Sequence, residues 1–204
     1  RPVLINSWES FYFRFTQRDL LSLAKQSRDL GCELFVLDDG WFGRRDNDKC
    51  SLGDWTTVNR KKLPDGLDGL ADQIRGLGMQ FGLWVEPEMV SADSDLYRAH
   101  PDWILGRPHQ AVGRHQYILD LTRREVRDHI IASMTEVFTK ARPAYIKWDM
   151  NRIFSDTFSA SLPPQRQGEV RHRYMLGLYH ILSVLTERFP DILFESCASG
   201  GNRT

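Results

Sequence analysis

Residues 145–152 read YIKWDMNR, a short apolar run that ends abruptly in Lys147, Asp149 and Asn151. The same change from apolar to functional side chains recurs in the stretches VLDDGW (36–41), FGLWVEPE (81–88) and ILFESC (192–197). Strands that repeatedly end in carboxylates, aromatic rings and small polar groups are typical of a parallel barrel whose functional residues gather at one end. This recurrence decides the predicted fold.

Predicted helices alternate with these strands. The strands are expected at residues 3–9, 34–37, 81–85, 117–121, 144–148 and 192–194. The helices are expected from an N-cap at Thr16 to a stop at Gly31, and at residues 67–77, 124–140 and 169–189. Continuous apolar strands between helices indicate a parallel sheet buried on both faces. We predict an α/β fold, a (β/α)8 TIM barrel with roughly its first six β/α units in residues 1–204.

A doubly wound open sheet is the competing architecture, because it also alternates strands and helices. It usually binds its ligand at one switch point and often carries a glycine-rich phosphate loop, and the sequence shows neither. A closed barrel needs eight strands, so two more strand–helix units are expected after Thr204. The chain therefore reads as one partial barrel domain from a longer protein.

The composition is that of a soluble globular domain, with 41% hydrophobic and 26% charged residues. Lys+Arg and Asp+Glu are equal at 27 each, so no net field attracts nucleic acid or an anionic membrane, which favours a neutral ligand. The three cysteines, at scattered spacings, are typical of neither a disulfide framework nor a zinc site and favour a reducing compartment. The chain shows no initiator Met, signal-peptide pattern or long apolar segment, which leaves secretion open.

Period-2 alternation places Lys147, Asp149 and Asn151 on the same face of an extended strand. A carboxylate with a donor on each side is suited to act as a nucleophile, a general base or a metal ligand. The structural alternative is an Asp that caps a neighbouring backbone group. Because three functional side chains share one face, we favour a functional role for Asp149.

Asp38 and Asp39 form a doubled carboxylate before Gly40, whose permissive backbone allows the chain to turn so that both reach one ligand. Such a pair is suited to neighbouring sugar hydroxyls, whereas a metal site needs further oxygen ligands that the sequence does not supply. We therefore predict no metal. Four tryptophans at strand ends suit the apolar faces of sugars, unless they pack in the core: Trp8, Trp41, Trp84 and Trp148.

Three further groups have both a functional and a structural interpretation. Glu86 and Glu88 flank Pro87, and either could form a buried ion pair instead of contacting a ligand. Arg114 precedes a predicted strand and is suited to hydrogen-bond ligand hydroxyls, although a surface Arg is the commoner outcome. Cys197 lacks a nearby base in the sequence and is a weak candidate nucleophile.

These motifs resemble the catalytic barrel of the α-galactosidases of glycoside hydrolase family 36, in clan D. The similarity covers nearly the whole chain and rests on NSWE (6–9), LDDGWFG (37–43), LGDW (52–55), GLWVEPEM (82–89), DLYRAHPDW (95–103), KWDMNR (147–152) and FESCASGG (194–201). The resemblance implies that Asp149 is the catalytic nucleophile and that Asp38 and Asp39 grip galactose hydroxyls at C4 and C6. It also implies sugar contacts at Trp8, Trp84, Arg114, Lys147, Asn151, Cys197 and Gly200.

The resemblance further implies what lies outside residues 1–204. The family's general acid/base is an Asp in a motif downstream of the Cys-x-x-Gly-Gly segment, so it is expected beyond Thr204. The N-terminal β-sandwich and the C-terminal β domain of the family are likewise expected outside this partial catalytic barrel.

The activity implied is a retaining α-galactosidase that hydrolyses terminal α-D-galactosyl residues of galacto-oligosaccharides of the melibiose and raffinose type. The alternatives are a galactosyltransferase of the raffinose-synthase type, an α-N-acetylgalactosaminidase and a non-catalytic sugar-binding barrel. No cofactor, nucleic acid or membrane is expected. By resemblance, the full-length protein is expected to be a cytoplasmic homo-oligomer, a tetramer.

Overall fold

The computed structural model describes residues 1–107, 110 and 112–199. Its main sheet has five parallel strands in the order β1-β2-β3-β6-β7, which follows the order of the chain. The strands are β1 (Leu4–Asn6), β2 (Leu34–Leu37), β3 (Gln80–Val85), β6 (Tyr145–Trp148) and β7 (Leu193–Ser196). Because the order never reverses in the described part of the chain, the sheet has no switch point there and is not doubly wound.

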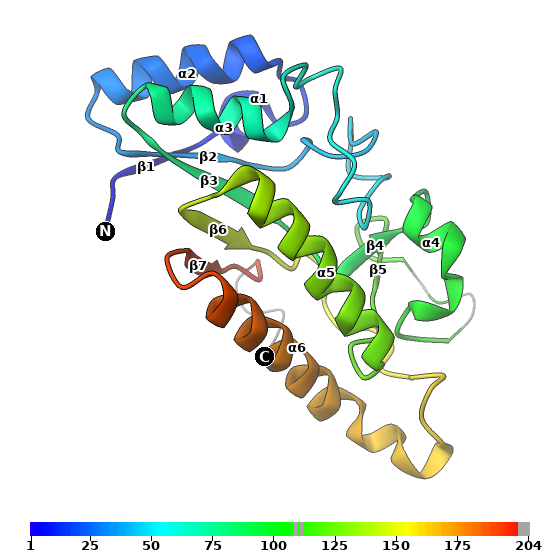
Figure 1. Cartoon of the computed structure of the whole chain (residues 1–204). Helices are drawn as coiled ribbons and strands as arrows, with labels where there is room; N and C mark the ends of the chain where they lie inside the picture. The colour runs from blue at the N-terminus through cyan, green and yellow to red at the C-terminus, as the bar shows by residue number, and fades with distance from the viewer. Residues whose placement is uncertain (108–109, 111, 200–204) are drawn as a thin grey trace.

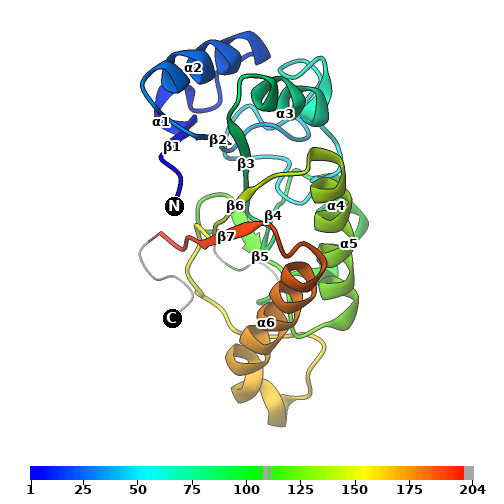
Figure 2. The same cartoon turned by 60° about the vertical axis from the view of Figure 1, so that its left-hand side comes forward.

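The connecting helices cover one side of this sheet (Figures 1 and 2). They are α2 (Gln17–Asp29), α3 (Gly66–Gly76), α5 (Arg124–Ala141) and α6 (Val170–Arg188), and each packs against the next along the chain. Shorter elements are α1 (Trp8–Phe11), α4 (Asp95–Ala99) and two 3-10 helices, Pro101–Trp103 and Pro164–Glu169. Parallel strands joined in this way all present their carboxyl ends at the same edge.

Local signals at the first long helix match the sequence prediction. Thr16 is the N-cap of α2, where its hydroxyl accepts from Asp19 N–H and the Asp19 carboxylate accepts from Thr16 N–H. Gly31 follows the end of α2 with φ of +92°, a conformation that costs glycine little. The strand predicted at residues 3–9 is shorter than expected, because Trp8 already begins α1.

The strand predicted at residues 117–121 is wrong as a member of the parallel sheet. Only Tyr117 and Ile118 of this run lie in a strand, β5 (Gln116–Ile118), which pairs antiparallel with β4 (Met89–Ser91) in a separate two-stranded ribbon. A short apolar run has no feature that separates a core parallel strand from half of such a ribbon. The described residues therefore supply five strands of the parallel sheet, not the six predicted.

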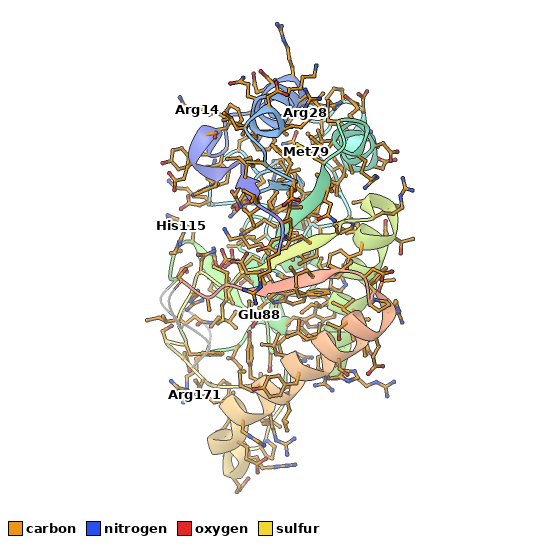
Figure 3. All side chains as sticks on the ribbon, turned by 90° about the vertical axis from the view of Figure 1, so that its left-hand side faces the viewer. Arg14, Arg28, Met79, Glu88, His115 and Arg171 are labelled. Atoms are coloured by element: carbon orange, nitrogen blue, oxygen red, sulfur yellow. The ribbon has the colours of Figure 1, made fainter. Side chains whose placement is uncertain are left out.

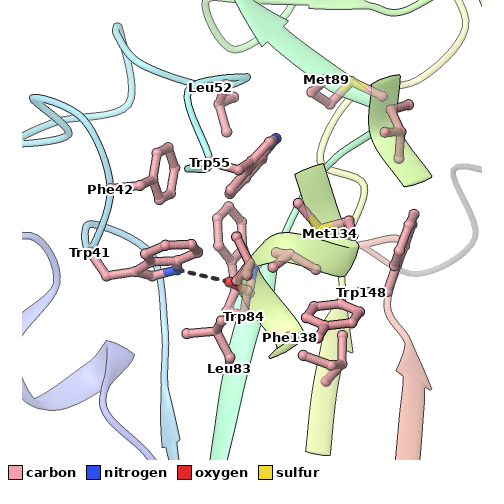
Figure 4. Packing of buried hydrophobic residues seen from close by; sticks show 14 of the residues in the cluster. Trp41, Phe42, Leu52, Trp55, Leu83, Trp84, Met89, Met134, Phe138 and Trp148 are labelled. Atoms are coloured by element: carbon pink, nitrogen blue, oxygen red, sulfur yellow. Dashed lines mark hydrogen bonds between the residues drawn. The ribbon is translucent and has the colours of Figure 1, made fainter. Parts of the chain in front are cut away.

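Buried aromatic rings fix the carboxyl end of β3. The Trp41 Nε1–H donates to Trp84 O at 3.0 Å, and the Phe42 ring lies nearly parallel to the Trp84 ring, with centroids 6.4 Å apart (Figure 4). Trp41, Trp84 and Trp148 are 0%, 2% and 2% exposed, so these three strand-end rings belong to the core. Trp84 is held in place by the same packing.

Glu88 is also part of the interior framework. Its carboxylate accepts from Trp148 Nε1 at 2.8 Å and from the Tyr174 hydroxyl at 2.7 Å. Figure 3 shows Glu88 among the packed elements and Arg171 at the outer surface. In the described ranges, no helix is both long and apolar enough to cross a membrane.

Candidate active site

A cavity of about 310 Å³ opens at the carboxyl ends of the parallel strands. Nine side chains predicted from the sequence line it: Trp8, Asp38, Asp39, Trp84, Arg114, Lys147, Asp149, Asn151 and Cys197. The tenth predicted residue, Gly200, lies outside the described residues. The fold thus gathers residues from every strand end of the sheet around one space of a size suited to a small ligand.

Asp149 is a buried carboxylate that accepts several hydrogen bonds inside the cavity. It is 5% exposed, and its Oδ2 accepts from Trp84 Nε1 at 3.0 Å and from Asn151 Nδ2 at 2.8 Å. Its Oδ1 accepts from the Met150 N–H at 2.8 Å, and the Cys197 thiol provides a further hydrogen bond. Burial opposes ionisation of Asp149, but these four donors outweigh it and lower the pKa of the carboxyl group below its ordinary value.

Lys147 pairs with Asp38 rather than with Asp149, its neighbour on the same face of the strand. Its Nζ donates to Asp38 Oδ2 at 3.1 Å, so the ion pair joins β6 to the end of β2. Asn6 Nδ2 donates to the same Asp38 oxygen at 2.7 Å. Burial lowers the pKa of Lys147, but the charge and the hydrogen bond of Asp38, together with the Asp149 charge, outweigh burial and raise the pKa above its usual value. Hydrogen bonds, rather than a paired cation, therefore dominate the ionisation of Asp149.

Asp39 pairs with Arg45, which was not predicted as a site residue. The Arg45 guanidinium approaches it in two-pronged geometry, with Nε to Oδ1 at 2.9 Å and Nη2 to Oδ2 at 2.8 Å. Arg45 is 1% exposed and Asp39 is 6% exposed, so this is a buried ion pair. Burial raises the pKa of Asp39, and the Arg45 charge opposes that rise. Gly40, with φ of +109°, makes the expected turn beside the doubled carboxylate.

Asn151 links Asp149 to the outer part of the cavity. Its Oδ1 accepts from Arg114 Nη1 at 3.2 Å and from the Ser199 hydroxyl at 2.7 Å. Arg114 is exposed and therefore free to reach outward from this bond. Burial and the Asp149 hydrogen bond raise the pKa of Cys197, so the group is a protonated thiol that donates to Asp149 rather than a nucleophile.

Several residues of the cavity were not predicted as site residues: Phe13, Arg45, Asp48, Glu86 and Gln116. Glu86 was weighed as a possible ion-pair member, and the others carried no signal in the sequence. In the described ranges, no group of three or more His, Cys, Asp or Glu side chains is arranged to hold a metal ion. The arrangement offers Asp149, an ionised carboxylate without a paired cation, beside hydroxyl-binding groups and an aromatic wall.

Comparison with known proteins agrees with this chemistry. The family model described as Melibiase matches residues 1–204. Over 100% of the chain, it is 56% identical to alpha-galactosidase AgaA from Geobacillus stearothermophilus and 50% identical to alpha-galactosidase Mel36A from Lactobacillus acidophilus. It spans 28% of the length of each of these relatives.

Solved structures give the same result. The crystal structure of GH36 alpha-galactosidase AgaA from Geobacillus stearothermophilus matches with a TM-score of 0.96, covering 100% of this chain and 28% of that one. A structure of an AgaA variant in complex with raffinose matches with a TM-score of 0.95 at 56% identity, over the same shares of the two chains. With a family model that matches its whole length and relatives of this similarity, the chain belongs to the melibiase family, glycoside hydrolase family 36.

Proposed function

We propose that the chain is part of the catalytic domain of a retaining α-galactosidase that removes terminal α-D-galactosyl residues from galacto-oligosaccharides. The observation that carries the proposal is Asp149, a carboxylate held ionised by four donors inside a cavity lined with sugar-binding groups. The named activity of the relatives supports it, as do the AgaA variant structures in complex with raffinose and with stachyose.

In the proposed mechanism, Asp149 attacks the anomeric carbon as the bond to the leaving oxygen breaks. The leaving oxygen takes a proton from a general acid, and Asp149 becomes esterified to galactose. The same acid group, now a base, removes a proton from water, which attacks the anomeric carbon and releases galactose with its α configuration. By family resemblance, we expect this second carboxyl group beyond Thr204. Asp38 and Asp39 would bind the galactose hydroxyls, and Trp8 and Trp84 would form the apolar walls.

The proposed architecture is a closed eight-stranded barrel in the full-length protein. The five parallel strands described here, with helices on one side only, would form part of its wall. Three more strands would then close it, since the barrel has eight. Residues 1–204 would be a partial catalytic domain, and the remaining domains and a tetrameric assembly are part of the same proposal. Light scattering of the full-length protein tests the tetramer.

The reaction is tested with the full-length protein and p-nitrophenyl α-D-galactoside, followed by proton NMR. We expect α-galactose as the first product, before mutarotation, because two displacements at the anomeric carbon retain its configuration. First release of β-galactose would contradict the retaining mechanism. Preferential cleavage of the matching N-acetylgalactosaminide, or transfer to sucrose in place of hydrolysis, would identify one of the alternative activities.

Substitution of Trp84 by Phe tests how Asp149 is kept ionised. The Trp84 N–H is the donor that contributes most to stabilising the charged form, so its loss raises the pKa of Asp149. Activity requires ionised Asp149, and therefore the acid limb of the kcat/KM profile is expected to move to higher pH. At neutral pH Asp149 stays ionised in both proteins, so kcat/KM there is expected to remain within about threefold of that of the parent protein.

Trp41→Phe is the matched control for Trp84→Phe. It also removes a buried indole N–H, but that group donates to the Trp84 carbonyl and not to Asp149. Its acid limb is expected to coincide with that of the unsubstituted protein. An equal displacement in both variants would assign the effect to packing and refute the role given to the Trp84 N–H.

A further inference from the structure

Glu86 is a buried carboxyl group at the edge of the cavity that the proposed mechanism does not use. It follows β3, is 1% exposed and lines the same space as Asp149. Its Oε1 accepts a short hydrogen bond from the Asn151 backbone N–H, and its Oε2 accepts from Gln116 Nε2 at 3.4 Å. Both of these partners are uncharged amides.

The charges that face Glu86 are unfavourable to a carboxylate. Asp149 at the end of β6 and Asp39 at the end of β2 are both negatively charged and would repel an ionised Glu86. The cations of the cavity have other partners: Arg45 binds Asp39, Lys147 binds Asp38 and Arg114 binds Asn151 Oδ1. Burial, together with the Asp149 charge, raises the pKa of Glu86 to about 8. At neutral pH the group is therefore mostly protonated.

A protonated Glu86 needs an acceptor for its proton, and Gln116 can supply one. Gln116 is 1% exposed, and its Oε1 is buried with no hydrogen-bond partner in the part of the chain that the structure describes. The nitrogen and oxygen of a glutamine amide exchange places by a half-turn. When Glu86 is ionised, Gln116 Nε2 faces it and donates a hydrogen bond. When Glu86 is protonated, Gln116 Oε1 faces it and accepts one.

Glu86 also controls the position of a donor to the nucleophile. Its hydrogen bond fixes the main chain of Asn151, and the Asn151 side chain donates to Asp149 Oδ2 at 2.8 Å. We propose that Glu86 is a positioning residue that works as an uncharged carboxylic acid, holding Asn151 so that its amide reaches Asp149 without bringing a second negative charge beside the nucleophile. The inference rests on the proposed function, because it assigns Asp149 the role of nucleophile.

Two variants of the full-length protein separate the charge of Glu86 from its hydrogen bond. Glu86→Gln keeps an acceptor for Asn151 N–H and resembles the neutral acid, so kcat at pH 6–7 is expected within about threefold of the parent protein. A change of kcat or KM that the parent shows near pH 8 should be missing in Glu86→Gln, because an amide does not titrate. Glu86→Leu leaves the Asn151 N–H unsatisfied, so kcat should fall about 10- to 100-fold with little change in KM.

The pH profile distinguishes a positioning role from a purely structural one. In Glu86→Leu the acid limb of kcat/KM is expected to move to higher pH, because the Asn151 donor to Asp149 is no longer fixed. Glu88→Gln is the control, since it changes an equally buried carboxyl group that contacts Trp148 and Tyr174. In Glu88→Gln, both the acid limb of kcat/KM and the change near pH 8 should remain as in the parent protein.

An infrared measurement tests the charge of Glu86 without catalysis. In the difference spectrum of the parent protein minus Glu86→Gln, the carbonyl stretch of one protonated carboxylic acid should be present at pH 6 and weaken through about pH 8. If the parent protein had no α-galactosidase activity, the proposed function would be refuted, but the infrared measurement would still report whether Glu86 is protonated. An active parent protein would refute the inference about Glu86 if Glu86→Gln lost as much kcat as Glu86→Leu, or if the infrared band were missing.

Discussion

Replacing Asp149 with Gly is expected to abolish turnover of p-nitrophenyl α-D-galactoside by the full-length protein, with kcat reduced on the order of 10⁴-fold or more. Asp149 combines burial at 5% exposure with donors that stabilise its charge, as a nucleophile at neutral pH requires. Without the carboxylate, no group forms the covalent galactosyl intermediate, and the second displacement has no substrate.

Rescue by azide tests the nucleophile role of Asp149 more directly than the loss of activity does. In Asp149→Gly a small anion has room beside the anomeric carbon, and attack from that face is expected to give β-galactosyl azide and to restore leaving-group release. In Asp48→Asn, which changes another carboxylate of the cavity, azide should produce no β-galactosyl azide because Asp149 still fills that position. Near-normal activity of Asp149→Gly, or a failure of azide to rescue it, would remove Asp149 from the nucleophile role.

The strands of the parallel sheet were predictable because each is a run of apolar residues that ends at functional groups. β2, with the sequence LFVL, is buried at every position, and only a strand covered on both faces needs such a run. The run at residues 117–121 looks the same locally, yet its partner is β4 and not a neighbour in the parallel sheet. That choice depends on contacts across the chain, which a short apolar segment does not encode.

The residues that line the cavity were more predictable than the ion pairs that they form with one another. Alternation along one strand correctly brought Lys147, Asp149 and Asn151 to one cavity. It did not reveal that Lys147 pairs with Asp38, which lies on another strand. Arg45 lay beyond prediction for a different reason, since it belongs to an irregular loop with no periodicity and a polar neighbourhood typical of a surface. Only the folded loop turns it inward to Asp39.

The buried Asp39–Arg45 pair leads to the second large effect. Arg45→Met is expected to lower the free energy of unfolding by about 3–5 kcal/mol, because it leaves a buried carboxylate without its counter-charge. Asp39→Asn should destabilise by a similar amount, because the guanidinium then lies buried and unpaired. Both variants are also expected to lose galactoside binding, since Asp39 would contact the sugar. Denaturant unfolding and thermal midpoints of the full-length protein measure the stability effects.

The pH dependence of Arg45→Met follows from the direction of the Asp39 pKa. Burial already raises that pKa, and removing Arg45 removes the charge that opposes the rise. A group with a raised native pKa stabilises the fold below its unfolded pKa, near 3.9 for Asp, and loses that contribution as pH rises. The stability difference between Arg45→Met and the parent protein should therefore be larger at pH 7 than at pH 5.

A double-mutant cycle separates the ion pair from general damage to the loop. The double variant Asp39→Asn, Arg45→Met removes both charges, so it is expected to be clearly more stable than the sum of the two single effects predicts. Arg124→Met provides the control, because Arg124 pairs with Asp128 at the surface, where the side chains are 86% and 56% exposed. An exposed pair of this kind contributes about 0.3–0.5 kcal/mol. Strict additivity in the cycle, or an Arg45→Met effect no larger than that of Arg124→Met, would show that Arg45 does not hold Asp39 by its charge.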